Sequence, residues 1–169
     1  MTETNLKEVL KKQQNYTKNS EKENIEDTLQ VIGFVVGDEE FAIPILNVIE
    51  IVKPIEYTRV PGTPNYVLGV FNLRGNVFPL INLRLKFGLS AIAQDKDTRY
   101  LVIKHEDKTA GFVIDKLTEA IRLKHSEIDS IPESFDEQEN LMQSMQGIGK
   151  RDNRLITILK TEILLKKTF

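Results

Sequence analysis

Several residue types that build enzyme and metal sites are absent or scarce in this sequence. Its 169 residues include no cysteine, no tryptophan and only two histidines. Without cysteine there is no disulfide, thiolate zinc site, iron–sulfur cluster or cysteine nucleophile, and this composition suits a reducing compartment. His105 and His125 are each isolated, without a second imidazole at the spacing of a metal-binding pair. We therefore expect no metal and no cofactor.

Net charge and long apolar runs are also lacking. The 23 Lys and Arg residues against 25 Asp and Glu residues give a formal net charge of -2 at pH 7. No whole-molecule field therefore draws the protein to nucleic acid or anionic lipid. No apolar run approaches the roughly 20 residues of a membrane helix, and the first residues lack the basic-then-apolar order of a secretory signal. We expect a cytoplasmic protein without direct membrane insertion.

Catalytic motifs are missing or incomplete. The stretch Gly147-Ile-Gly149 begins like a dinucleotide fingerprint, but Asp152 takes the place of the third glycine. The same stretch fails as a phosphate loop because Ser144 stands where the first glycine belongs. No Gly-x-Ser-x-Gly elbow occurs. These departures argue against an enzyme, so we expect no catalytic residues.

The composition changes near residue 29. Residues 1–28 hold scattered Lys, Glu, Asn and Gln with few large apolar side chains, which cannot bury enough surface to offset the entropy of ordering. We expect a flexible charged tail there, with a short helix around Leu6, Val9 and Leu10 as the alternative. Residues 29–169 are expected to form the folded domain.

The folded part has the pattern of an all-β protein with short helices. From Leu29 onward, short β-branched and aromatic runs are separated by Gly, Pro, Asn and Asp at close intervals. No strand is followed by a long helical crossover, which argues against a parallel α/β sheet. The spacing predicts hairpins with turns at 37–40, 75–76 and 106–108, a connector near 88–98, and strands over 117–123 and 154–160.

Finer predictions concern individual elements. Pro44 followed by apolar residues at helical spacing predicts a short amphipathic helix with Glu50 off its apolar stripe, and Thr161 can cap another. In the 66–83 hairpin, alternation places Arg74 on the face of Asn72, and Pro79 predicts an edge strand or a bulge. Alternation along 117–123 places four side chains on one face: Leu117, Glu119, Ile121 and Leu123.

Several segments together resemble the CheW coupling proteins of bacterial chemotaxis. The most specific part is Asn72-Leu-Arg-Gly75, framed by Gly69 and Pro79. The resemblance covers Leu29 to about Leu165. The segments that carry it are 36–51, 59–64, 69–84, 111–115 and 148–159.

The resemblance implies a fold and a function. The implied fold is two SH3-like five-stranded β-barrels packed on a shared apolar interface, with no active site. The implied function is that of a non-catalytic adaptor that couples transmembrane chemoreceptors (methyl-accepting chemotaxis proteins) to the histidine kinase CheA. Its implied partners are the kinase's regulatory domain, a homologue of the same fold, and the cytoplasmic tips of the receptors. Its implied location is the cytoplasm, with recruitment to membrane-associated receptor arrays.

The resemblance also implies a partner-binding surface. Arg74 matches the family's arginine near the receptor groove, and Glu50 matches the acidic residue facing it. The other matched positions also fit plain structural roles on the residues alone. Val48 and Ile51 fit the role of core side chains, and Gly69 and Gly75 fit the role of glycines that serve backbone geometry. The further positions expected at partner surfaces are Val48, Ile51, Gly69, Asn72 and Gly75.

Three positions depart from the family pattern. Asn82 stands where the family usually has Asp, and Pro44 and Lys160 replace acidic residues. These changes remove negative charge, so salt bridges at those sites are not carried over.

A nucleic-acid-binding β-barrel is the competing class. Lys150, Arg151 and Arg154 form a small basic cluster of the kind that such a protein uses. The aromatic side chains that would have to stack on bases lie inside apolar runs that should build cores, so we expect a solvated turn and no nucleic-acid partner. These aromatic residues are Phe34, Phe41, Phe71, Phe78 and Phe112. A small-molecule enzyme is a more distant alternative.

Overall fold

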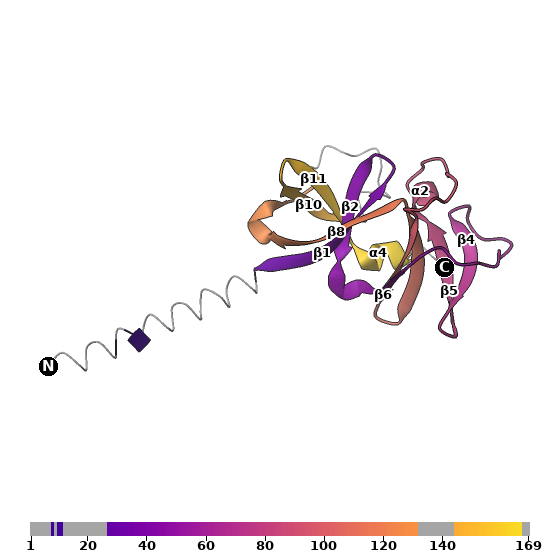
Figure 1. Cartoon of the computed structure of the whole chain (residues 1–169), viewed down its shortest axis with the longest axis horizontal. Coiled ribbons are helices and arrows are strands. Elements are labelled where there is room, and N and C mark those ends of the chain that lie inside the picture. The colour runs from indigo at the N-terminus through magenta and orange to yellow at the C-terminus, as the bar shows by residue number, and fades with distance from the viewer. Residues whose placement is uncertain (1–7, 9, 12–26, 132–143, 167–169) are drawn as a thin grey trace.

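Two β-sheets contain most of the residues that the structure describes (Figure 1). The computed structural model describes residues 8, 10–11, 27–131 and 144–166, so the predicted tail lies almost wholly outside the described residues. One sheet has the strand order β8-β1-β2-β11-β10-β9 and the other β3-β6-β7-β5-β4. The strands of the first sheet are β1 (Thr28–Val36), β2 (Glu39–Pro44), β8 (Lys116–Lys124), β9 (Ile128–Asp129), β10 (Met145–Arg151) and β11 (Arg154–Leu159). Those of the second are β3 (Val48–Val52), β4 (Val67–Leu73), β5 (Asn76–Asn82), β6 (Arg99–His105) and β7 (Lys108–Ile114). The helical elements are η1 (Ile45–Asn47), α2 (Leu83–Lys86), η2 (His125–Glu127) and α4 (Thr161–Lys166).

Each sheet curls into a barrel because its two end strands are brought together. In the six-stranded sheet, β9 follows β8 after the single turn η2 and pairs with β10 at the opposite end. In the five-stranded sheet, Thr58 follows β3 and forms a two-way backbone bridge with Val70 of β4, at 2.8 Å in each direction. The predicted pair of barrels is confirmed, and the two-residue β9 gives one of them a sixth strand.

Side-chain alternation along the strands divides the core into three clusters. In β6, Tyr100 and Val102 belong to the cluster inside the five-stranded barrel, whereas Leu101 and Ile103 belong to the cluster shared by both sheets. Helix α4 adds Leu164 to the shared cluster, against β6 and β7. Burying one such side chain stabilises the fold by roughly 1.5–3 kcal/mol. The predicted shared apolar interface is confirmed. Its buried residues include Phe34, Val36, Phe41, Ile43, Ile81, Leu101, Ile103, Phe112, Ile114 and Leu159.

The chain passes from one barrel to the other between β2 and β3 and again between β7 and β8. Strands from the two ends of the chain share a barrel because β2 pairs with β11 in parallel. Residues 88–98 contain no helix or strand, but they lie between α2 and β6 within the five-stranded barrel. The predicted connector therefore does not separate the two barrels.

The amphipathic helix predicted after Pro44 is wrong. Residues Ile45–Asn47 form only the 3-10 turn η1, and Val48–Val52 form strand β3, which pairs with β6. This strand is mostly β-branched, a composition that favours extended backbone over helix. Glu50 therefore lies on a strand. The second predicted helix, at Thr161, is confirmed as α4.

The predicted hairpins form, and the one at 66–83 differs in detail. Its turn is Arg74-Gly75, with φ of 53° and 84°, so Arg74 does not continue the strand face of Asn72. Two consecutive positive φ values are the signature of a tight hairpin turn. Strand β5 is an interior strand, not an edge, and Pro79 lies just before the stretch that pairs with β7, where no backbone donor is required.

A β-bulge in β8 separates side chains that were predicted to share a face. Ile121 and Leu123 belong to the cluster inside the six-stranded barrel, but Leu117 packs against the cluster between the barrels. The pairing with β1 shifts register between Ile32 and Phe34, which reverses the two faces of β8. The predicted common face is therefore wrong.

Candidate functional site

An ion pair between Arg74 and Glu50 is the centre of the predicted partner-binding surface. Arg74 lies at the tip of the β4–β5 hairpin and Glu50 lies on β3, with Nη2 and Oε1 2.9 Å apart. Strands β3 and β4 are the two ends of the five-stranded sheet, so closure of the barrel brings the two residues together. The proximity that the family resemblance implied is present.

This ion pair contributes little to folding. The Arg74 side chain is 79% exposed and that of Glu50 is 26% exposed. Exposed pairs of this kind are worth about 0–1 kcal/mol, because solvent screens the charges and two side chains lose rotamer freedom. Within the described residues, one guanidinium nitrogen bonds to the protein, which leaves the other donors of Arg74 available to a partner.

Asn72 and Gly75 give the hairpin turn its shape. The Oδ1 atom of Asn72 accepts a hydrogen bond from the Gly75 N–H at 3.1 Å, which is a typical way for Asn to stabilise a turn. Gly75 has φ of 84°, and a Cβ atom there would meet nothing within 4 Å. Both residues are exposed beside Arg74.

The other predicted site residues occupy packing positions. Val48 and Ile51 are half-buried against the core cluster between the barrels. Gly69 is buried with φ of 154°, and a Cβ atom there would lie 2.1 Å from the carbonyl oxygen of Thr58. The structure thus groups Glu50, Asn72, Arg74 and Gly75 on the surface, and gives Val48, Ile51 and Gly69 structural contacts.

We expect Gly69→Ala to destabilise the protein strongly, by about 3 kcal/mol, because the new methyl group would collide with backbone in a conformation that L-residues avoid. Gly75→Ala is the matched control. It also has a positive φ but open space around it, so its cost should be about 1 kcal/mol. Urea unfolding midpoints at equal m-values measure both costs. Equal losses for the two variants would contradict the structural role of Gly69.

Asn82, which stands where the family usually has Asp, caps the start of helix α2. Its Oδ1 atom accepts a hydrogen bond from the Leu85 N–H at 3.2 Å, at the start of α2. Asn and Asp are both favoured at this position, so the loss of charge preserves the cap.

A second ion pair, which the sequence reasoning missed, joins the two barrels. The Nε atom of Arg84 in α2 lies 2.9 and 3.0 Å from the two carboxylate oxygens of Asp115, which stands at the crossing from β7 to β8. Asp115 also accepts a hydrogen bond from the Gly37 N–H at 2.8 Å, in the β1–β2 turn. The side chains of Arg84 and Asp115 are only 19% and 17% exposed. The one signal in the sequence was a carboxylate at the end of an apolar run, 109–114.

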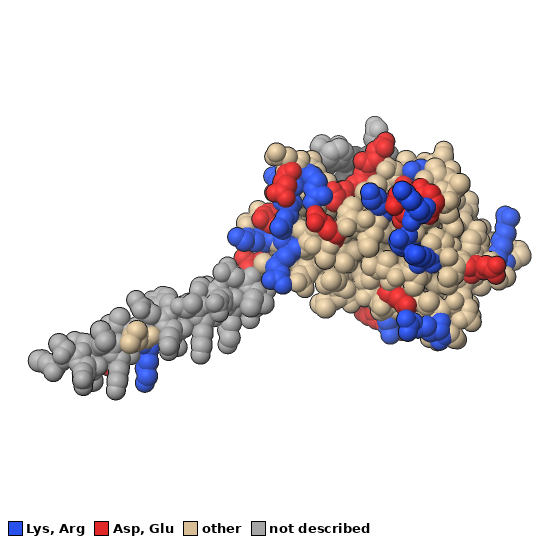
Figure 2. Space-filling model, in the orientation of Figure 1, with Lys and Arg blue, Asp and Glu red and all other residues tan. Residues whose placement is uncertain are grey.

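The basic cluster at the β10–β11 turn is paired with local acceptors. Arg154 contacts Glu119 at 2.7 Å and Glu40 at 3.4 Å, and Lys150 forms an ion pair with Asp129. The hydrogen bond to Glu119 and the charge of Glu40 raise the pKa of Arg154. Figure 2 shows positive and negative side chains interspersed over the face in view.

The aromatic residues considered for base stacking are not available on the surface. Phe34, Phe41, Phe71 and Phe112 are buried, and Phe78 is half-buried. A nucleic-acid surface therefore gains no support here.

Residues 30–169 match the family described as the CheW-like domain. The chain belongs to the CheW family. The chemotaxis protein CheW of Helicobacter pylori is 62% identical over 164 residues, which cover 97% of this chain and 98% of that protein. The chemotaxis protein CheW of Bacillus subtilis is 36% identical, over 82% of this chain and 87% of the relative. The crystal structure of the scaffolding protein TtCheW from Thermoanaerobacter tengcongensis superposes with a TM-score of 0.71 at 29% identity, covering 78% of this chain and 88% of that chain.

The family assignment bears on several predictions. The all-β, two-barrel fold is the fold of a solved CheW protein, so the predicted family and fold class are confirmed. The similarity to the Helicobacter pylori CheW extends into the segment before residue 30, because it spans 97% of the chain. Among the described residues, no helix is both long and apolar enough to span a membrane.

Proposed function

We propose that this CheW-family chain is a non-catalytic adaptor that couples transmembrane chemoreceptors to the histidine kinase CheA. The exposed Arg74–Glu50 pair carries this proposal, because it lies on the hairpin that holds the most specific part of the family pattern. The adaptor works in the cytoplasm, is recruited to receptor arrays and uses no cofactor. It binds the regulatory domain of CheA and the cytoplasmic tips of receptors.

Exposed apolar residues lie next to Glu50 in sequence and next to Asn72 in strand register, and they suit a helical receptor tip. Ile49 precedes Glu50 on β3 and is exposed. Val77 is exposed and lies opposite Asn72 in the β4–β5 register. A receptor tip, itself a helical hairpin, buries apolar side chains against such residues while its polar groups meet the free donors of Arg74. The surface thus offers both apolar area and a fixed charge.

The two barrels act as one rigid body in this proposal. The shared apolar cluster and the Arg84–Asp115 pair hold the barrels in a fixed relation. A receptor bound beside Arg74 and a kinase domain bound to an exposed strand or loop of one barrel therefore keep a defined geometry. Small rigid shifts at one interface then reach the other without any chemical step in the adaptor.

Cosedimentation tests this function. The purified chain is mixed with membranes that contain chemoreceptors, with and without CheA, and its pelleted fraction is compared with that on receptor-free membranes. We expect pelleting only with receptors, and capture of CheA by the immobilised chain. Single-stranded DNA is the control ligand, since salt-dependent binding to it, with no pelleting, would favour the nucleic-acid-binding alternative.

A further inference from the structure

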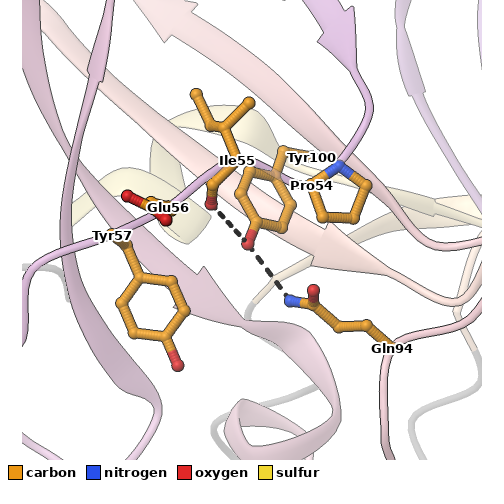
Figure 3. A pocket seen from close by; sticks show the side chains of 6 residues that line it. All are labelled: Pro54, Ile55, Glu56, Tyr57, Gln94 and Tyr100. Atoms are coloured by element: carbon orange, nitrogen blue, oxygen red, sulfur yellow. Dashed lines mark hydrogen bonds between the residues drawn. The ribbon is translucent and has the colours of Figure 1, made fainter.

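An open depression on the five-stranded barrel lies outside the surface described so far (Figure 3). Its volume is about 460 Å³, within the roughly 300–1,000 Å³ of typical ligand pockets. It is formed by the segment after β3, by the segment before β6 and by Tyr100 of β6. The lining residues are Pro54, Ile55, Glu56, Tyr57, Gln94 and Tyr100. An opening this wide suits a side chain presented by a partner protein.

Hydrogen bonds at Tyr100 hold the depression in shape before any ligand arrives. The Tyr100 hydroxyl donates to the carbonyl oxygen of Ile55 at 3.2 Å and accepts from the Gln94 Nε2 atom at 3.1 Å, as the dashed lines in Figure 3 show. Burial raises the pKa of Tyr100, so the hydroxyl stays protonated and keeps its donor role at neutral pH. One buried group thus connects two separate wall segments.

The chemistry of the walls favours a cation. Glu56 is the one charged residue that lines the depression; it is exposed, and it forms no ion pair with any residue that the structure describes. The neighbouring Tyr57 is 42% exposed, so a cation can reach its ring. Because the Gln94 amide nitrogen bonds Tyr100, its carbonyl oxygen remains an acceptor. Pro54 and Ile55 offer apolar contact to an aliphatic stem.

We propose that this depression binds an arginine or lysine side chain from a partner protein. The cationic head pairs with the Glu56 carboxylate and lies over the Tyr57 ring, and its stem packs on Ile55. The lining of the depression includes neither Arg74 nor Glu50, and its charge preference is opposite to that of Arg74, since Arg74 offers donors and Glu56 offers an acceptor. It gives the adaptor a charge-selective contact in addition to its proposed partner surface.

A peptide titration followed by NMR tests this site. The ¹⁵N-labelled full chain is titrated with acetyl-Leu-Arg-Leu-amide and, in parallel, with the citrulline peptide, which has the same shape without the charge. We expect the arginine peptide to shift the amide signals of residues 55–57 and 94, and the citrulline peptide to bind about tenfold more weakly. Glu56→Gln should lose about threefold to fivefold in affinity for the arginine peptide, because it removes the ion pair but leaves the contact with the Tyr57 ring.

Two further variants separate the contacts. Tyr57→Leu keeps apolar area but removes the ring, so affinity should fall several-fold while signals elsewhere stay in place. Glu39→Gln, an exposed carboxylate on the other barrel, should bind as the unmodified chain does. The proposal is overturned by equal binding of the two peptides, by full affinity in Glu56→Gln, or by the absence of shifts at the depression. Receptors and kinase take no part in this titration, so its outcome is independent of the adaptor function.

Discussion

Replacing Asp115 by alanine is expected to lower the free energy of unfolding by about 3 kcal/mol, because it leaves the mostly buried Arg84 guanidinium without its counter-charge, with the Nη1 atom still bonded to the Ser90 carbonyl oxygen. It also removes the acceptor of the half-buried Gly37 N–H, and leaving such a donor without a partner adds to the cost. The loss falls on the junction where the chain crosses between the barrels. Urea unfolding followed by circular dichroism measures it.

Two controls show whether burial causes this loss. Asp115→Asn keeps an acceptor for Gly37 and removes only the charge, so its cost should be smaller than that of Asp115→Ala. Glu50→Gln breaks the exposed pair with Arg74 and should cost less than about 1 kcal/mol. If Asp115→Ala were no more destabilising than Glu50→Gln, the ion pair would not join the barrels in the way described.

Arg74→Glu is expected to abolish receptor-dependent stimulation of the kinase while the protein stays folded. The new carboxylate would stand next to Glu50 and repel it, and the donors offered to the receptor would be lost. Stability should change by less than about 1 kcal/mol, since the native pair is largely exposed. The measurement is the rate of phosphoryl transfer from ATP to CheA in the presence of receptor membranes.

A charge reversal elsewhere on the same barrel serves as the control for Arg74→Glu. Lys108 is exposed at the start of β7, beside the β6–β7 turn, and Lys108→Glu should stimulate the kinase as the unmodified chain does. A well-folded Arg74→Glu protein with full stimulation would remove Arg74 from the receptor surface.

Features set by neighbouring residues were predicted well from the sequence. The hairpin at Gly37 and the strands on either side of it follow from a turn signal between β-branched runs, and they form as predicted. Helix α4 was predicted from Thr161 and an apolar stripe over one short segment, and it forms. Thr161 is its first residue, however, and the Thr161 hydroxyl donates to the Oδ1 atom of Asn47. The Arg74–Glu50 proximity came from the family resemblance, because spacing alone does not show that β3 and β4 meet when the barrel closes.

Features set by distant pairing were missed. The apolar spacing after Pro44 fits a helix as well as a strand, and only pairing with β6 decides for β3. The bulge that turns Leu117 away from Ile121 depends on the register with β1. Arg84 and Asp115 are 31 positions apart in the sequence, and no local sequence pattern predicts that they form an ion pair.

Coupling is tested most directly by the kinase activity of CheA with receptor membranes, measured with and without the purified wild-type chain. We expect phosphoryl transfer from ATP to rise above the basal rate only when receptor, kinase and chain are all present. The same rate with and without the chain, under conditions in which the chain is folded and in excess, would contradict the adaptor function.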